Sequence, residues 1–492
     1  SESLSGYQME QFLENAPNAV PSVSFILVDW SCRESFHTLH YLNHQNIPRD
    51  QYEIIWIEFF NRKAEAIQKR LDEDRESGRP PSVDQWLALG FSNDLCHHKH
   101  LMYNVGIALA RGRIVTFCDS DAMYQPSFAQ SIIDSFDSDK NPDLNQSGIV
   151  LHCDEVRNID KKLYPFSFPT FDEVLGEGCI NWDGEKTTGL NHHEDALHHR
   201  NYGACMSALK EDLIAIGGAD EHLDYLGHIC GPYEMTFRLI NAGKRELWHP
   251  KEFSFHTWHP GTDGEYDHMG PHDGFHMSST ALAARTTKRS LPLQENHALQ
   301  TLRLGSEVSD SKTLMQQALN IDSSHWNLKR LKQLDQKRVV NSSIFKKIFT
   351  QFMERVAFSL KKHKSLKGLL RAIFYTSFFY ARNLIRQNTQ IQVNCKLFLD
   401  NLAAENSKEF AILSTGEVAE HLYSLAKKSS LQIEGVYDIS SGGSFHDLKI
   451  SPVEDLAGYS GKVVLGTHDD LENRVNLLKG LGIPPDRIIV LM

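Results

Sequence analysis

The sequence lacks the patterns that mark several classes of protein. No apolar run is long enough to span a bilayer, and residues 1–19 are polar and acidic, without the apolar core of a signal peptide. The eight cysteines are scattered singly, and no Cys-x-x-Cys pair occurs. These absences predict a cytoplasmic protein with reduced thiols, each serving in packing.

An excess of positive charge is also missing. Lysine and arginine together number 51 against 63 aspartates and glutamates, so the formal net charge is −12. This balance argues against general nucleic-acid binding. Hydrophobic residues make up 41% and charged residues 23% of the 492 residues. That composition is typical of folded domains, and the length predicts more than one of them.

The most informative stretch that is present is Arg113-Ile-Val-Thr-Phe-Cys-Asp-Ser-Asp121. Its apolar run is short enough for a buried strand of a parallel sheet, and two acids follow it. Open α/β sheets bind ligands at the carboxyl ends of their strands, and alternation points Asp119 and Asp121 the same way. Two carboxylates offer oxygen ligands to Mg²⁺ or Mn²⁺, which can hold a diphosphate. Asp-x-Asp alone is also common in solvated turns.

The residues before this strand narrow the interpretation. Asn104 and Gly106 lie in a helical pattern that Gly112 closes, and the apolar strand and the two acids follow. In this order and spacing, residues 20–260 resemble the GT-A glycosyltransferases, especially family 2 and its polypeptide GalNAc-transferase relatives. The resemblance implies an α/β fold and transfer of a hexosyl or N-acetylhexosaminyl group from a nucleotide-diphosphate sugar, with a UDP-sugar as the expected donor.

The resemblance also implies a donor side. In the family, the loop after the first strand touches the nucleotide, and an acid at the end of the second strand binds the base or ribose. A carboxylate can accept from a uracil N–H or a ribose hydroxyl, although a strand end often carries a charge without such a role. The expected nucleotide-sugar contacts are Asp29, Trp30, Glu58, Lys99, Asn104, Asp119 and Ser120.

A metal site is implied further along the chain. Gly243, Pro250 and His256 follow Arg238 at the spacing of the polypeptide GalNAc-transferases, whose matching histidine is the third protein ligand of the metal. A neutral imidazole ligates Mn²⁺ well. The expected ligands are Asp119, Asp121, His256 and His259, with Mn²⁺ or Mg²⁺ as the cofactor and His256 favoured over His259. We expect residues 261–277, which are rich in glycine, to form a lid.

The acceptor side is less regular. Residues 217–221 resemble the Gly-Gly-x-Asp-Glu turn of the family, and residues 231–238 resemble the helix that carries its catalytic carboxylate. Gly231 and Pro232 stand where many family 2 enzymes have an adjacent Glu-Asp pair. The expected base is therefore Glu234, with Asp224 as the second candidate. Because Glu234 and Arg238 are four residues apart on a helix, a structural ion pair is the alternative.

Three domains are expected: a GT-A domain over residues 1–285, a basic helical region over 286–390 and a small Rossmann-like α/β domain over 391–492. Twelve basic residues stand against one acid in 337–386, interleaved with apolar residues. This pattern is typical of an interfacial helix on an anionic membrane surface, and packing on the acidic domain is the alternative. In the last domain Gly416 alone marks the first turn, which favours partner docking or substrate positioning over dinucleotide chemistry.

The expected function is metal-dependent transfer of a sugar to a hydroxyl of a glycan or lipid-linked acceptor in polysaccharide biosynthesis, at the inner face of the membrane. Two alternative functions compete with this one. A nucleotidyltransferase or pyrophosphorylase would need a Gly-rich phosphate loop after the first strand, which the sequence lacks. A non-catalytic carbohydrate-binding or scaffold protein with a degenerate GT-A site is suggested by the missing Glu-Asp pair. The sequence makes no prediction of oligomeric state.

Overall fold

The computed structural model describes residues 9–15, 19–142, 148–164, 167–190, 200–227, 231–259, 277–306, 310–331, 391, 394–405, 409–439, 442–467 and 471–491. The chain divides into two compact units. The first comprises Ser1–Gly270 and Ser290–Asn327, and the second comprises Pro271–Arg289 and Leu328–Met492. Among the described residues, no helix is both long and apolar enough to cross a membrane.

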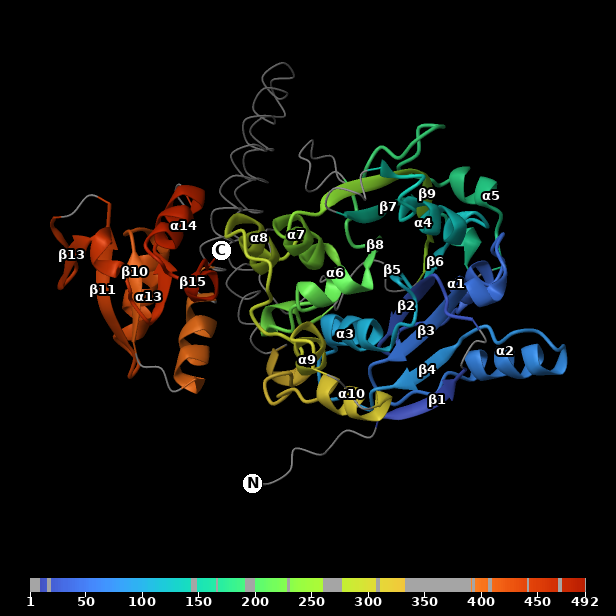
Figure 1. The fold of residues 1–492 in the computed structure, drawn as a ribbon, viewed down its shortest axis with the longest axis horizontal. Helices are drawn as coiled ribbons and strands as arrows, with labels where there is room; N and C mark the ends of the chain where they lie inside the picture. Colours follow the sequence, from blue (N-terminus) through green and yellow to red (C-terminus); the bar gives the residue numbers. More distant parts are fainter. Residues whose placement is uncertain are drawn as a thin grey trace, which may run out of the picture. The chain divides into compact units, whose positions relative to one another are not determined.

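The described part of the first unit is built on a mixed nine-stranded sheet in the order β1-β4-β3-β2-β5-β8-β7-β9-β6 (Figure 1). Its strands are β1 (Glu10–Glu14), β2 (Val23–Asp29), β3 (Tyr52–Glu58), β4 (Gln85–Ala88), β5 (Ile114–Cys118), β6 (Ala122–Met123), β7 (Ile149–Asn158), β8 (Cys205–Leu209) and β9 (Arg245–Thr257). Strand β2 pairs in parallel with both β3 and β5. Strand β8 is antiparallel to its two neighbours, β5 and β7.

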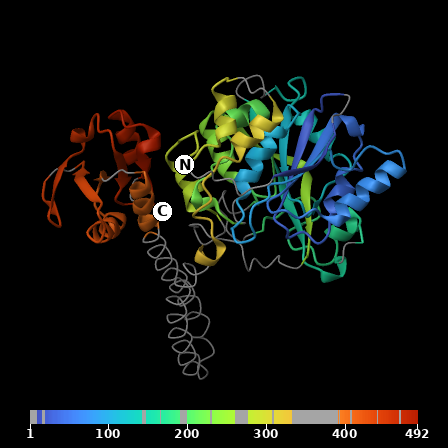
Figure 2. The ribbon, with the colours of Figure 1, turned by 90° about the horizontal axis from the view of Figure 1, so that it is seen from below.

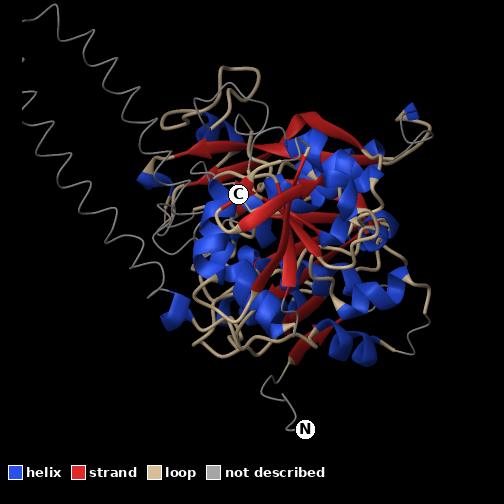
Figure 3. Ribbon diagram, turned by 90° about the vertical axis from the view of Figure 1, so that its left-hand side faces the viewer, coloured by secondary structure: helices blue, strands red, loops and turns tan. Residues whose placement is uncertain are grey.

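Helices lie on both sides of this sheet (Figures 2 and 3). They are α1 (His37–Leu42), α2 (Glu65–Glu76), α3 (Lys99–Leu109), α4 (Phe128–Ser135), α5 (Phe171–Leu175), α6 (Lys210–Ala215), α7 (Tyr233–Asn241), α9 (His297–Arg303) and α10 (Ser311–Ala318). Helix α3 packs closely on β2, because a Cβ on Gly106 would lie 2.6 Å from the Ile26 side chain. Phe25, on the opposite face of β2, stacks on Phe128 of α4. Every residue of β2 and β3 is buried, as expected of parallel strands covered on both faces.

The order of the strands creates a topological switch point between β2 and β5. The chain moves from β2 outward through β3 to β4, and then returns to the other side of β2 to form β5. The loops that follow β2 and β5 therefore leave the sheet side by side at the carboxyl ends of these strands. In open α/β sheets a ligand binds in the crevice at such a point. Asp29 to Arg33 and Asp119 to Asp121 are in these two loops.

The predicted helical region falls partly in the first unit. Helices α9 and α10 pack against each other, α9 also contacts α6, and α10 contacts α3. Residues 290–327 thus belong with the large sheet. The predicted basic segment 337–386 lies outside the described residues, and so does the predicted lid 261–277 apart from Met277.

The second unit contains a separate α/β sheet in the order β12-β13-β11-β10-β14-β15 over the described residues. Its strands are β10 (Glu409–Leu413), β11 (Gln432–Asp438), β12 (Ser444–Phe445), β13 (Leu448–Pro452), β14 (Lys462–Leu465) and β15 (Ile488–Ile489), with helices α8 (Ser279–Thr286), α13 (Glu417–Ala426) and α14 (Leu471–Gly480). The pairs β10–β11, β10–β14, β11–β13 and β14–β15 are all parallel. The predicted doubly wound pattern is confirmed.

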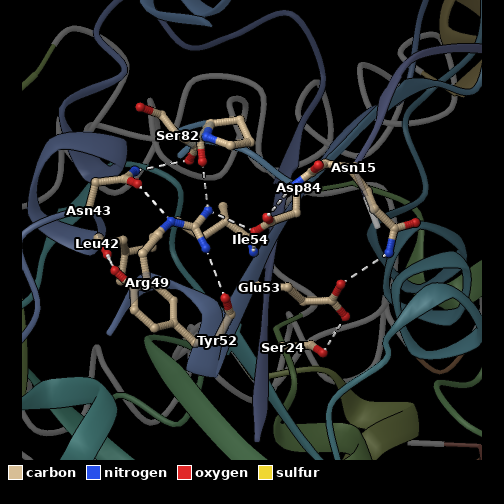
Figure 4. A network of polar contacts seen from close by, with 12 residues as sticks. Asn15, Ser24, Leu42, Asn43, Arg49, Tyr52, Glu53, Ile54, Ser82 and Asp84 are labelled. Carbon is tan, nitrogen blue, oxygen red and sulfur yellow. Dashed lines mark hydrogen bonds and ion pairs between the residues drawn. The ribbon is translucent and has the colours of Figure 1, made fainter. Parts of the chain in front are cut away.

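A buried polar network at the amino ends of β2 and β3 stabilises the large sheet (Figure 4). One Asp84 carboxylate oxygen accepts from Arg49 Nη2 at 2.7 Å and from the Ile54 backbone N–H at 2.8 Å. The same guanidinium donates to the carbonyl groups of Tyr52 and Pro81. Glu53 accepts from the Ser24 hydroxyl at 2.6 Å. These contacts connect the segment before β4 with β3, and β3 with β2.

We expect Asp84→Asn to lower the free energy of unfolding by about 2 kcal/mol, because it removes the charge that Arg49 and the Ile54 N–H share. Thermal and denaturant unfolding of the full chain measure the change. Asp134→Asn is the control, because Asp134 pairs with Lys140 at the surface, with side chains 37% and 56% exposed. It should cost less than about 1 kcal/mol. Equal losses in the two variants would contradict a special role for the buried network.

Candidate active site

Asp121 is the centre of a polar cluster that forms where the loop after β5 meets the end of β9. The short strand β6 pairs with β9 and places Ala122 opposite His256. His256 therefore lies beside the Asp119–Asp121 loop. The Asp121 Oδ2 atom is 2.8 Å from His259 Nε2 and 3.3 Å from His256 Nε2. A carboxylate and two imidazoles thus converge from segments that are 135 residues apart in the sequence.

The donor set fits a divalent metal ion. One ligand atom from each of Asp121, His256 and His259 lies within 4.8 Å of the others, the one such group of three found among the described residues. The two Nε2 atoms are only 3.2 Å apart, so their lone pairs need a proton or a cation between them. A cavity of about 20 Å³ borders Asp121 and His259, which is room for one water or small ion. The carboxylate oxygen suits Mn²⁺, and imidazole nitrogens bind several first-row divalent metals.

The pKa values of the two carboxylates, Asp119 and Asp121, are shifted in opposite directions. Burial raises the pKa of Asp119 to about 7, and the charges of Asp121 and Glu155 add to this effect against the opposing pull of Lys99. Burial would also raise the pKa of Asp121, but Arg33 and His256 outweigh it and hold that pKa well below its usual range. Asp121 is therefore the stronger anionic ligand. Asp119 lies close enough to influence it but is not one of the three converging groups.

Groups from the β2 loop and α1 hold the Asp119–Asp121 loop in place. The Ser120 hydroxyl donates to the Val28 carbonyl at 2.7 Å and accepts from Arg33 Nε at 2.7 Å. His37 Nε2 lies 2.7 Å from the Asp121 carbonyl oxygen. Ser120 is 1% exposed. The structure therefore places this predicted nucleotide contact between the two loops, where it joins them.

Two predicted donor-side acids shape the β2 loop itself. Glu58 accepts from the Ser31 hydroxyl at 2.7 Å and from its N–H at 3.1 Å. Asp29 accepts from the backbone N–H groups of Cys32 and Arg33 and from Arg62 Nη2. Both acids are buried. Burial, together with the charge of Asp29, raises the pKa of Glu58 to about 7.

Trp30 presents an aromatic surface next to these groups. Its ring stacks on His97 at 4.2 Å with an interplanar angle of 2°. The Lys99 Nζ atom is 5.7 Å and the Arg33 Cζ atom 5.5 Å from the Trp30 ring centroid. The structure thus brings together Asp29, Trp30 and Lys99 with the metal-ligand candidates. A ring flanked by two cations suits a ligand that carries both a planar base and phosphate.

Asn104 is placed away from this cluster. Its amide donates to the Ala219 carbonyl and to Glu221 Oε1, both at 2.9 Å, and accepts from the Ala219 N–H at 2.7 Å. Gly218 in the same turn has a φ of +69°, and a Cβ there would lie 2.4 Å from the Asn104 side-chain oxygen. Asn104 therefore fixes the Gly-Gly-x-Asp-Glu turn on α3.

Glu234, the predicted base, forms a fully buried ion pair. Arg238 donates to both Glu234 carboxylate oxygens, and the Asp220 N–H donates to Oε2 at 3.2 Å. The two side chains of the pair are 0–1% exposed. Arg238 also donates to the carbonyl groups of Ile216, Gly218 and Ser290. These contacts favour the structural alternative for Glu234, while Asp224, which lies 3.5 Å from His222 Nδ1, is 13% exposed.

Several residues of the cluster were not predicted individually from the sequence. Arg33 and His37 contact Asp121 from the β2 side, and neither belongs to a motif. Arg157 is in register with His256 on the neighbouring strand, and its guanidinium is held by Glu155 at 2.5 Å. Arg157 lies on β7, and the register that brings it opposite His256 follows from strand pairing, which local periodicity does not encode.

Comparisons with known proteins give only weak likenesses, all to solved structures. No protein-family model and no curated protein matches the chain. Among solved structures, it is similar to S. aureus TarS 1–349, with 12% identity and a TM-score of 0.32 over 48% of this chain and 60% of that one. A second is the mannosyltransferase PcManGT from Pyrobaculum calidifontis in complex with GDP-Man and Mn²⁺, with 13% identity and a TM-score of 0.32 over 66% and 76%. A third is TarS 1–349 in complex with UDP-GlcNAc, with 12% identity and a TM-score of 0.32 over 57% and 71%. Likeness at this level does not establish a function, which has to be inferred from the residues of the site.

We expect Asp121→Asn to weaken Mn²⁺ binding by at least about 100-fold, because it removes the charged member of the ligand set. Asp119→Asn should weaken it by about 10-fold, since Asp119 acts mainly through its nearby charge. Calorimetry or electron paramagnetic resonance of Mn²⁺ measures both values. Asp94→Asn, at an exposed position, serves as the control. Undiminished Mn²⁺ affinity in Asp121→Asn would show that these residues do not form the metal site.

We expect Glu234→Gln to destabilise the protein by about 3–5 kcal/mol, because Arg238 is left buried without a full counter-charge. Thermal unfolding of Glu234→Gln and of the double variant Glu234→Met/Arg238→Met measures the effect, and the double variant should recover much of the loss. A Glu234→Gln protein of native stability that has lost only sugar transfer would instead support the catalytic role.

Proposed function

We propose that the first unit is a metal-dependent glycosyltransferase that uses a nucleotide-diphosphate sugar, with a UDP-sugar as the expected donor. The observation that carries the proposal is the Asp121, His256 and His259 cluster at the switch point of the sheet. The Trp30 loop, which follows the neighbouring strand, lies beside it through Arg33. An aromatic ring, two cations and a divalent-ion site, connected through Arg33, match the base, phosphates and counter-ion of such a donor.

In this proposal each group has a role that its contacts support. Asp121, His256 and His259 would hold Mn²⁺ or Mg²⁺, with Asp119 adding negative charge. The bound ion would offset the charge that develops on the departing diphosphate. Trp30 and Lys99 face the nucleotide side, while Asp29, Glu58 and Ser120 keep the two loops in position through their hydrogen bonds.

Sugar transfer also requires a group that takes the acceptor proton. The acceptor oxygen forms a bond to the anomeric carbon, the bond from that carbon to the diphosphate oxygen breaks, and the hydroxyl proton passes to a base. Glu234 and Asp224 are the two proposed bases. Asp224 has the more exposed side chain, 13% against 1% for Glu234. The bonds from Arg238 and Asp220 leave Glu234 poorly placed to receive a proton.

The proposed acceptor is a hydroxyl of a glycan or of a lipid-linked precursor. This part of the proposal is supported by the resemblance and by the basic, apolar composition of residues 337–386, which suits an anionic membrane surface. A second candidate function is carbohydrate binding without transfer. The buried ion pair at Glu234 and the missing Glu-Asp pair favour it.

A donor screen separates these functions. The 492-residue chain is incubated with Mn²⁺ and a panel of UDP- and GDP-sugars, and released nucleotide is measured without an acceptor. We expect slow hydrolysis of one UDP-sugar, lost after metal chelation and in Asp121→Asn. Tight binding of a donor without any release would support the non-catalytic function. If no sugar nucleotide binds in the presence of Mn²⁺, the proposed function is wrong.

A further inference from the structure

Arg33 forms an ion pair with Asp121 Oδ2, the oxygen atom that a metal ion at this site would also bind. Its Nη1 atom is 2.9 Å from Asp121 Oδ2, the same atom that His259 and His256 approach. Its Nε atom donates to the Ser120 hydroxyl. The Arg33 side chain is 9% exposed, so the ion pair with Asp121 is shielded from solvent and is not a screened surface contact.

A guanidinium and a divalent ion compete for this position. Arginine stays protonated at any relevant pH, so the Arg33 charge cannot be removed by losing a proton. Two cations on one carboxylate oxygen in a buried site repel each other far more strongly than they would in water. A metal ion that binds Asp121, His256 and His259 therefore has to displace the Arg33 side chain.

The rest of the β2 loop anchors the Arg33 backbone, so displacement by a metal ion would move the side chain alone. The Arg33 N–H donates to Asp29 at 3.3 Å, and the Arg33 carbonyl accepts from Arg62 Nη1 at 3.1 Å. The guanidinium lies 5.5 Å from the Trp30 ring centroid, and Lys99 Nζ lies 5.7 Å from the same centroid. A guanidinium that leaves Asp121 remains in this cationic region, where its planar fork suits phosphate oxygens.

We propose that Arg33 is a displaceable cation: it neutralises Asp121 without metal, competes with the metal for Oδ2, and pairs with the donor diphosphate once the metal has taken its place. The second part rests on the proposed function, and the first part does not. Arg33 thereby opposes metal binding alone and supports diphosphate binding. Removing its charge should shift the two affinities in opposite directions, which a merely structural role would not do.

The test compares Arg33→Met with Arg62→Met, which removes an equal charge from the same region. Arg62 pairs with Asp29 and Glu58 and donates to the Arg33 carbonyl, and none of these contacts is to Asp121. Calorimetry first measures Mn²⁺ alone, and then UDP at saturating Mn²⁺. In Arg33→Met we expect Mn²⁺ affinity to rise by about 10-fold and UDP affinity to fall by about 10-fold, within the usual range of coupling between sites. In Arg62→Met the Mn²⁺ affinity should stay within about twofold. Arg33→Lys, which keeps the charge, should show a smaller rise in Mn²⁺ affinity and serves if Arg33→Met does not fold.

Each outcome decides one part. Unchanged or weaker Mn²⁺ binding in Arg33→Met would overturn the competition, and so would an equal rise in Arg62→Met, which would reflect general charge or a loosened β2 loop. Unchanged UDP affinity in Arg33→Met would overturn the pairing with the diphosphate. If the wild-type protein binds Mn²⁺ but not UDP, the UDP-sugar donor of the proposed function is wrong, while the Mn²⁺ titrations still decide whether Arg33 competes with the metal.

Discussion

The crossover that separates β2 from β5 is the constraint on which the rest of the site depends. Because the chain builds the sheet outward on one side of β2 and then returns to the other, two loops diverge at neighbouring carboxyl ends. One loop brings Arg33 and the other brings Asp121. Pairing of β6 with β9 adds His256 to the same place. No single segment contains the site, and strand pairing brings its segments together.

Buried polar contacts keep this arrangement rigid. Ser120 joins the two loops, and Asn104 holds the turn at 218–221 against α3. The Glu234–Arg238 pair supports the same turn through the carbonyl groups of Ile216 and Gly218. Each of these groups is buried, so losing one of these hydrogen bonds would leave a polar atom with neither a protein partner nor water. Several residues whose motif positions suggest chemistry therefore serve to hold the chemical groups in place.

The cysteines show how assembly changes the interpretation of single residues. In the sequence they are isolated and only packing is expected of them. In the structure Cys118 on β5 is in register with Cys205 on β8, and Cys153 on β7 contacts the Cys205 thiol. All three are free thiols within the core of the first unit. Their expected packing role agrees with this burial, but the row they form across three strands depends on register alone.

The sequence by itself determined the elements whose signal is local. The apolar runs of β2, β3 and β5 predicted buried strands, and the position of Asp119 and Asp121 at a strand end predicted a ligand edge. Strands β1 and β4 escaped prediction because neither has a long apolar run of the kind that marks β2 and β5. Tertiary structure decided which side chains meet: the partners of Asp121 lie 88 residues before it and 135 and 138 residues after it. Such meetings follow from crossovers and register, which no local periodicity encodes.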